Sequence, residues 1–145
     1  MDTPIRSLID EKPADLLTVS EDTTVTEAVK IMNDKNIGAV MITKNGALTG
    51  IFTERDVLRR ILAKNLHADE TKMSEVMTTK LLTIKPSNTI KDILVIITEK
   101  KIRHLPVLED NKLISIISAG DVSRYLVKDQ QHLIAELENY ISGSY

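Results

Sequence analysis

The chain has 145 residues, of which 42% are hydrophobic and 28% charged, a composition typical of a globular protein with one domain or two small ones. Lys and Arg number 19 against 21 Asp and Glu, and the net charge of −2 argues against a surface that binds nucleic acid or anionic membranes non-specifically. There is no cysteine, which excludes disulfides, zinc sites built on thiolates and thiol catalysis.

Neither a membrane span nor a secretory signal is predicted. The longest apolar run covers residues 93–97, whereas crossing a bilayer takes about 20 apolar residues. Residues 1–15 carry acidic residues and an early proline where a secretory signal has basic and then apolar residues. We therefore expect a cytoplasmic protein.

An internal repeat organises the sequence. Residues 17–62 align without a gap with residues 82–127, an offset of 65, and the aligned positions agree in character almost everywhere that they are apolar. Each copy alone would bury little apolar surface, so two copies favour two small modules that pair. The predicted domains are residues 7–66 and 72–130, followed by a C-terminal helix and tail at 131–145.

The first copy predicts the element order β-α-β-β-α. Thr24 and Glu27 have the spacing of a capping box at the start of the first helix, and Asn45-Gly46 is a strong hairpin signal between the second and third strands. The expected strands cover residues 17–19, 38–43 and 48–52, and the closing helix covers residues 56–64.

The second copy repeats this order, and a polar connection at residues 65–76 joins the two. A last amphipathic helix is expected at 129–140, with an apolar stripe of Leu133, Ile134, Leu137 and Ile141. The sequence therefore predicts an α/β (α+β) fold of two repeats with short terminal helices. The expected strands of the second copy cover residues 82–84, 104–108 and 113–117, and its closing helix covers residues 121–128.

The third strand of each copy ends in the pattern (Thr/Ser)-x-x-Asp, with Thr53 and Asp56 in the first copy and Ser118 and Asp121 in the second. A carboxylate at the start of a helix can accept two hydrogen bonds from the vicinal diol of a ribose, while the hydroxyl and the helix N–H groups face a phosphate. The alternative is a helix cap alone, because the same residue types are common caps. The recurrence of the pattern in register favours ligand binding.

The sequence carries no catalytic motif that we recognise. It has no GxSxG, no P-loop and no GxGxxG after a strand, and its five glycines are scattered. His67 and His132 stand apart from other residues that bind metals. We therefore expect neither an enzyme nor a metal site.

Several short motifs occur together between residues 7 and 128, and in combination they resemble the tandem CBS domains, also called the Bateman module. The likeness is strongest to stand-alone proteins made of one CBS pair without a catalytic domain. It implies a pseudo-twofold pair with two clefts for adenosine-containing ligands such as AMP, ADP, ATP, NAD(H) or S-adenosylmethionine, and a homodimer of two pairs. The motifs are Leu17-Thr18-Val19, Ala28-x-x-x-Met32, residues 36–40 (NIGAV), 50–56 (GIFTERD), 82–86 (LTIKP), 103–107 (RHLPV) and 118–122 (SAGDV).

The same resemblance implies that each cleft takes its ribose-binding Asp from one copy and much of its base pocket from the other. In the first cleft Asp121 would bind the ribose, Ser118 the ribose or phosphate, and Arg103 a phosphate. His104 is also interpreted as a partly buried polar residue or a pH sensor. The residues implied for this cleft are Thr18, Thr23, Gly38, Val40, Arg103, His104, Ile116, Ser118 and Asp121.

The second cleft lacks a counterpart of Arg103 and His104, because Gly38 and Ala39 occupy the aligned positions. It is therefore expected to hold a second nucleotide or nothing. The residues implied for it are Ile51, Thr53, Arg55, Asp56, Thr83, Asn88, Ile102 and Leu105.

Together these features indicate a regulatory sensor that binds AMP or a related ligand and changes its shape or association. A constitutive dimerisation or adaptor module without nucleotide, and a regulatory subunit of an enzyme that handles NAD or nucleotides, stay open as alternatives. The expected partners are an adenine nucleotide, a second copy of the chain and a regulated protein, with neither nucleic acid nor membrane. The C-terminal helix either packs on the protein's own core or seals a dimer.

Overall fold

The computed structural model describes residues 1–12 and 16–142 and divides the chain into two compact units. Unit 1 consists of Met1–Pro13, Lys85–Leu105 and Ile116–Tyr145, and unit 2 consists of Ala14–Ile84 and Pro106–Ser115. Unit 2 therefore holds the whole first copy with residues 82–84 and 106–115 of the second, and unit 1 holds the rest of the second copy with the segment that precedes the first. The domain limits predicted from the repeat stay a prediction.

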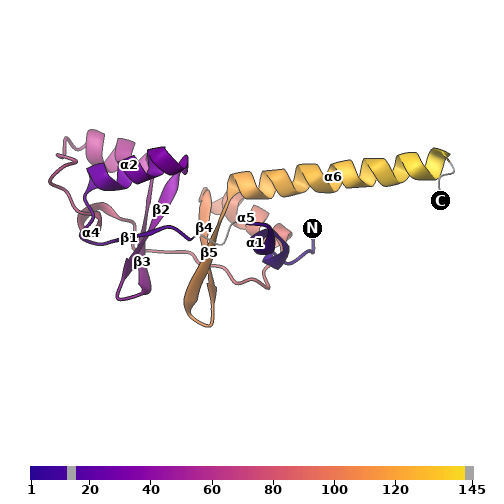
Figure 1. The fold of residues 1–145 in the computed structure, drawn as a ribbon, viewed down its shortest axis with the longest axis horizontal. Helices are drawn as coiled ribbons and strands as arrows, with labels where there is room; N and C mark the ends of the chain where they lie inside the picture. The colour runs from indigo at the N-terminus through magenta and orange to yellow at the C-terminus, as the bar shows by residue number, and fades with distance from the viewer. Residues whose placement is uncertain (13–15, 143–145) are drawn as a thin grey trace. The chain divides into compact units, whose positions relative to one another are not determined.

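Unit 2 contains a three-stranded sheet (Figure 1). β1 (Thr18–Ser20) pairs in parallel with β2 (Ala39–Lys44), and β2 pairs antiparallel with β3 (Ala47–Thr53). Helix α2 (Val25–Lys35) makes the crossover that a parallel pair requires. Buried apolar side chains from these elements form one core cluster: Val19, Val25, Ala28, Met32, Val40, Ile42, Phe52, Ile61, Met73 and Val76.

After β3 the chain enters α3 (Glu54–Asp56) and the π-helix η1 (Val57–Leu62). The helix predicted at 56–64 therefore begins at Glu54, because Thr53 caps it. The connection predicted at 65–76 contains a short helix, α4 (Met73–Val76). The prediction missed α4 because its apolar residues, Met73 and Val76, lie in an otherwise polar segment, but both are buried in the core of unit 2.

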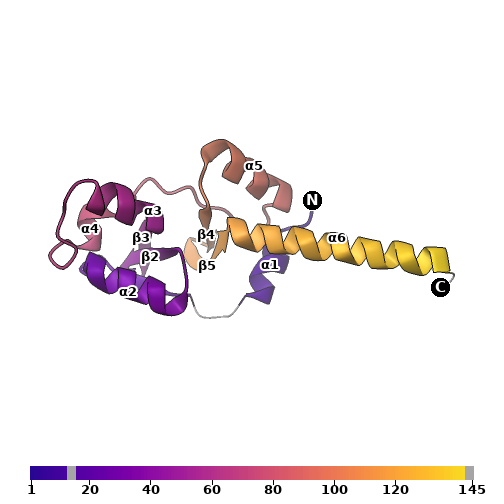
Figure 2. The same cartoon turned by 90° about the horizontal axis from the view of Figure 1, so that it is seen from above.

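Unit 1 contains α1 (Arg6–Glu11), α5 (Ile90–Lys100) and α6 (Ala119–Ser142). Figures 1 and 2 both show α1 beside the first part of α6, and these two helices are in contact. The prediction of separate helices at 121–128 and 129–140 is wrong, because no glycine or proline interrupts the chain between residues 121 and 142. Residues 143–145 of the predicted tail, and the side chain of Ile141, lie outside the described part of the chain.

The remaining strands, β4 (His104–Glu109) and β5 (Lys112–Ser118), form a two-stranded sheet whose residues are divided between the two units. Within unit 2, Ile84 pairs with Val107 of β4 as an isolated parallel bridge. It repeats the Val19–Ile42 pair of β1 and β2 at the offset of 65. The strand predicted at 82–84 is thus reduced to this single pairing.

The caps and turns of the two copies also match at the offset of 65. The predicted capping box of Thr24 and Glu27 begins α2, and Thr89 with Asp92 forms the same box at α5. Left-handed backbone occurs at three pairs of positions with this offset: Asn36 with Lys101, Asn45 with Asp110, and Gly46 with Asn111. The mixed α/β class and the repeat are therefore confirmed.

Among the described residues no helix is long and apolar enough to span a membrane.

The segment that precedes each copy bonds to the main helix of the other copy. The Ile90 N–H at the start of α5 donates to the Thr3 carbonyl at 3.0 Å, and the Val25 N–H at the start of α2 donates to the Thr71 carbonyl at 2.9 Å. These bonds satisfy N–H groups that have no partner within the helix. They also explain why α1, at the beginning of the chain, belongs to the unit that contains α5 and α6.

Phe52 is fully buried in the core of unit 2 (0% exposed), so we expect Phe52→Ala to lower the free energy of unfolding by about 3–5 kcal/mol. Urea denaturation followed by circular dichroism measures this change. Leu58→Ala is the matched control, because Leu58 is 61% exposed and its loss should cost little. Equal losses for the two variants would contradict this placement of the core.

Candidate functional site

Both (Thr/Ser)-x-x-Asp motifs form capping boxes where a strand passes directly into a helix. The Thr53 N–H donates to Asp56 Oδ2 at 2.9 Å, and the Asp56 N–H donates to Thr53 Oγ1 at 3.4 Å. In the second copy the Ser118 N–H donates to Asp121 Oδ2 at 2.8 Å, and the Asp121 N–H donates to Ser118 Oγ at 3.1 Å. The capping role considered from the sequence is therefore present, and it fixes both carboxylates in the same local geometry.

The start of each of these helices is also tied to the residue before the preceding hairpin. The Glu54 N–H donates to the Gly38 carbonyl at 3.0 Å, and the Ala119 N–H donates to the Arg103 carbonyl at 2.8 Å. The four residues are related by the offset of 65. In unit 1 this bond holds the backbone of Arg103 next to the turn that carries Asp121, while the Arg103 side chain is exposed.

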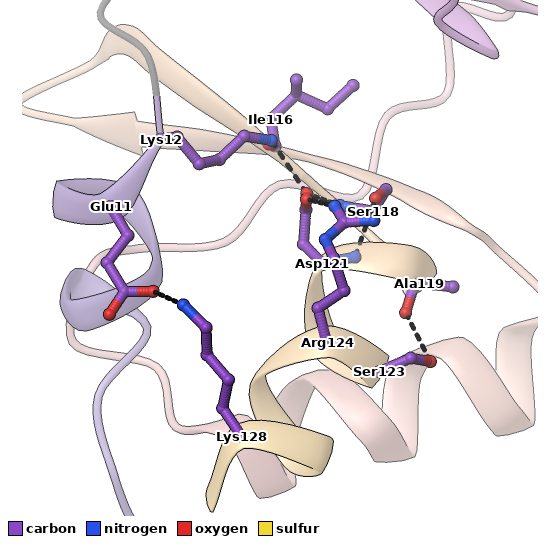
Figure 3. A network of polar contacts seen from close by, with 9 residues as sticks. All are labelled: Glu11, Lys12, Ile116, Ser118, Ala119, Asp121, Ser123, Arg124 and Lys128. Carbon is purple, nitrogen blue, oxygen red and sulfur yellow. Dashed lines mark hydrogen bonds and ion pairs between the residues drawn. The ribbon is translucent and has the colours of Figure 1, made fainter.

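The Asp121 carboxylate is the most heavily bonded group of the candidate site (Figure 3). Its Oδ2 atom accepts from Lys12 Nζ at 2.8 Å in addition to the Ser118 N–H, and its Oδ1 atom accepts from Arg124 Nη2. Lys12 Nζ also donates to the Ile116 carbonyl. Only 12% of the Asp121 side chain is exposed.

These contacts set the charge state of Asp121. Burial by itself raises the pKa of the carboxyl group, but the hydrogen bonds from Lys12 and from the Ser118 N–H, together with the charge of Lys12, outweigh it. The pKa of Asp121 is therefore lowered from its ordinary value. At neutral pH Asp121 is a carboxylate that only accepts hydrogen bonds.

Asp56 has a different cation. Its Oδ1 atom lies 3.4 Å from Arg60 Nε, and Arg60 also donates to the carbonyls of Val76 and Met77. Arg55, placed in the second cleft by the resemblance, has an exposed side chain. The two motifs thus share their backbone geometry and differ in the cations around the carboxylate.

A cavity of about 650 Å³ opens beside Asp121 within unit 1. Its walls come from α1 and the residue after it and from the first turns of α6, and they carry three basic and two acidic side chains. The lining residues are Leu8, Glu11, Lys12, Asp121, Arg124, Tyr125 and Lys128.

The residues predicted for each cleft fall in both units. For the first cleft, Arg103, His104, Ile116, Ser118 and Asp121 belong to unit 1, and the others, Thr18, Thr23, Gly38 and Val40, belong to unit 2. For the second cleft, Ile51, Thr53, Arg55, Asp56 and Thr83 belong to unit 2, and Asn88, Ile102 and Leu105 belong to unit 1. The grouping of each full set around one ligand therefore stays a prediction.

Several of these residues also have a structural role. Val40 and Leu105 are buried, at 1% and 0% exposure, and thus contribute to the core. Asn88 Oδ1 accepts from the Lys85 N–H at 2.8 Å, which stabilises the turn before α5.

Among the described residues no cluster of three or more His, Asp or Glu side chains has the geometry to hold a metal ion.

Lys12 and Arg124 both contact Asp121 in the candidate site, and the sequence predicted neither of them there. Arg124 lies within the aligned repeat, opposite Arg59, whereas Lys12 precedes residue 17 and has no aligned partner in the repeat. Its position beside Asp121 follows from the bonding of residues 3–6 to residues 86–90 in unit 1, which the sequence pattern does not show.

Comparison with known proteins gives a consistent family. The family model described as CBS domain matches residues 5–63 and 73–128. The mitochondrial CBS domain-containing protein CBSX3 of Arabidopsis thaliana is 39% identical over 129 residues, which cover 86% of this chain and 63% of that protein. The chain therefore spans less than two thirds of the length of this relative.

Solved structures agree with the fold. A protein with CBS domains from Burkholderia ambifaria superposes with a TM-score of 0.85 at 34% identity, covering 88% of this chain and 96% of that one. The CBS domain pair of protein MJ0100, in complex with 5′-methylthioadenosine and S-adenosyl-L-methionine, superposes with a TM-score of 0.77 at 24% identity, covering 89% and 99%.

The lowered pKa of Asp121 makes the stability of the protein depend on pH. A carboxyl group whose pKa is lowered by folding stabilises the folded state at every pH above its ordinary pKa of 3.8. This contribution is lost as the pH falls from that value through the lowered pKa of the folded state. We therefore expect Asp121→Asn to lower the free energy of unfolding at neutral pH, and the difference from wild type to shrink as the pH falls below that value.

Urea denaturation at a series of pH values measures this difference. Asp34→Asn, on the exposed side of α2, is the matched control and should change stability little at any pH of the series. A difference between Asp121→Asn and wild type that is independent of pH would contradict the assignment.

Proposed function

This chain belongs to the CBS domain family, and from that premise we propose that it is a regulatory module, not an enzyme, that binds an adenosine-containing ligand. AMP is the proposed ligand, with ADP, ATP, NAD(H) and S-adenosylmethionine as the alternatives of the same class. The adenosyl ligands of the MJ0100 domain pair support this class. The cytoplasm is the proposed location, although the name of the Arabidopsis relative places that protein in mitochondria.

The observation that carries the proposal is the setting of Asp121 in unit 1. An ionised carboxylate is held at the start of a long helix by Ser118, beside the backbone of Arg103 and next to an open cavity. A carboxylate of this kind accepts hydrogen bonds from the two hydroxyls of a ribose, and an exposed arginine donates charge-assisted hydrogen bonds to a phosphate. Asp121 and Arg103 thus supply complementary chemistry for a nucleoside phosphate.

The full proposed site combines this half with residues of the first copy. Thr18, Thr23, Gly38 and Val40 are proposed around the base and sugar, with Ile116 and His104 on the side of Asp121. The motif of the first copy, around Asp56, is proposed as a weaker site, because Gly38 occupies the position that aligns with Arg103.

The proposed mechanism is linkage between ligand binding and a change in shape or association. A ligand that binds one arrangement of the protein more tightly than another shifts the population toward it by the difference in affinity. A regulated protein that recognises one arrangement would then respond to the nucleotide concentration.

Thermal unfolding with and without AMP tests the proposal. On protein freed of ligand by unfolding and refolding, AMP at 100 times its Kd should stabilise wild type by about 2.7 kcal/mol, a rise of several degrees in Tm. We expect Asp121→Ala to abolish this rise. Asp56→Ala is the matched control in the other copy and should retain it.

NADH, ATP and S-adenosylmethionine serve as comparators in the same measurement and rank the alternative ligands. If none of the adenosyl compounds raises the Tm of wild type, the binding proposal fails.

An exposed apolar stripe on α6 favours a second candidate function, that of a dimerisation module. Leu133, Ile134 and Leu137 are 52%, 50% and 60% exposed, and Val127, two turns before Ile134, is 54% exposed. At 100° per residue the four side chains share one face of the helix. Isolated exposed apolar residues are ordinary, but several of them on one face of a helix indicate a contact surface.

A second copy of this chain is the proposed occupant of the stripe. Packing two such helices of 24 residues against each other would bury the same apolar face of both copies. Only the second half of the helix has a net charge, from Glu136 and Glu138, because Arg124 and Lys128 in the first half are balanced by Asp121 and Asp129.

We expect wild type to be a dimer and Ile134→Glu to be a monomer, because a charge in the centre of the stripe would be buried without a partner. Ala135→Glu adds the same charge on another face of α6 and should leave the dimer intact. Sedimentation velocity measures the oligomeric state of wild type and of both variants. A monomeric wild type, or loss of the dimer in both variants, would contradict the proposed role of the stripe.

A further inference from the structure

The bonds to Asp121 leave too few acceptor positions for a ribose. Its Oδ2 atom accepts from the Ser118 N–H and from Lys12 Nζ, and its Oδ1 atom accepts from Arg124. A carboxylate has about four acceptor positions, and a ribose diol takes two of them. At least one of the three existing donors has to leave when the diol binds.

The donor that leaves is a side chain. The Ser118 N–H belongs to the capping box and is fixed by the backbone at the start of α6. Lys12 and Arg124 reach Asp121 with long side chains, which are 27% and 73% exposed, so both can turn away without unfolding a helix.

The cavity beside Asp121 is suited to receive an anion together with these cations. Lys12, Arg124 and Lys128 line it against the two carboxylates of Asp121 and Glu11, an excess of one positive charge. Lys128 Nζ lies 3.9 Å from Glu11 Oε2, at the outer limit of an ion pair. A ribose is uncharged. If it displaces Lys12 from Asp121, the ammonium group of Lys12 loses its anionic partner, and an anion in the cavity would replace that partner.

We propose that the cavity between α1 and α6 is a phosphate subsite, and that Lys12 moves from Asp121 to the phosphate of a nucleotide when the ribose takes the carboxylate. This inference rests on the proposed function, because it requires a ribose at Asp121. Without a ligand, Lys12 keeps Asp121 paired in its partly buried position. With a ligand, the ammonium group and Arg124 donate to phosphate oxygens.

In the part of the chain that the structure describes, the motif around Asp56 has no lysine bound to its carboxylate in the way that Lys12 is bound to Asp121. Residues 3–6 and 71–74 make equivalent bonds in the two copies, so the position that corresponds to Lys12 is Lys80. The Lys80 side chain is exposed, and within the described residues the cation bound to Asp56 is Arg60. The phosphate subsite is therefore specific to the site around Asp121.

If Lys12 moves from Asp121 to the phosphate, its substitution should change the affinities for AMP and for adenosine in opposite directions. In Lys12→Met the binding of AMP should weaken about tenfold or more, because a charge-assisted hydrogen bond to phosphate is lost. Adenosine should bind to Lys12→Met at least as tightly as to wild type, because it no longer has to displace the lysine. Isothermal titration calorimetry with AMP and with adenosine, on refolded protein freed of ligand, measures both.

Two further variants separate the charge from the fold. Lys80→Met is the matched control and should leave both affinities unchanged. Lys12→Arg keeps a cation at this position and should retain the preference for AMP over adenosine. Inorganic phosphate should not replace AMP, because it cannot release Lys12 from Asp121.

Each other outcome overturns the inference. An equal loss of AMP and adenosine binding in Lys12→Met would make Lys12 a structural residue only, and an unchanged AMP affinity would place the phosphate elsewhere. Binding of inorganic phosphate as tight as that of AMP would make the cavity a simple anion site without an exchange. If wild type binds neither AMP nor adenosine, the proposed function itself fails, which is a distinct result.

Discussion

The exchange of segments between the two copies is the constraint on which the rest of the structure depends. The N–H groups at the start of α2 and α5 have no partners within their own helices, and each set is satisfied by the segment that precedes the other copy. Residues 3–6 are thereby fixed against residues 86–90 in unit 1. Because α1 follows this segment directly, Lys12 is brought to Asp121, more than a hundred residues further along the chain.

Local features of the fold could be predicted from the sequence, because they depend on neighbouring residues. The capping box of Thr24 and Glu27 and the turn at Asn45-Gly46 are determined by residues a few positions apart. The repeat gave the same elements a second time and led to the family. The short α4 and the continuous α6 were missed, since the first depends on burial of Met73 in a distant core and the second on the absence of any interruption after Asp121.

For the candidate site, the sequence identified the two carboxylates but not their surroundings. Asp56 and Asp121 have nearly the same backbone contacts, as the aligned copies suggest. Their cations come from different places, Arg60 from the next turn of the same helix and Lys12 from the beginning of the chain. Such long-range partners depend on how the segments pack, and a comparison of one copy with the other contains no record of them.

The continuity of α6 has a mechanical consequence for the site at its start. The helix has 24 residues and is therefore about 36 Å long, and Asp121 lies in its first turn. From Asp121 onward the helix contains no glycine or proline, the usual causes of a sharp kink, so a tilt at its start would be carried to its far end. A tilt of about 5° at the first turn would move the far end by about 3 Å over this length. A small rearrangement around Asp121 would thereby produce a displacement large enough for another protein surface to detect.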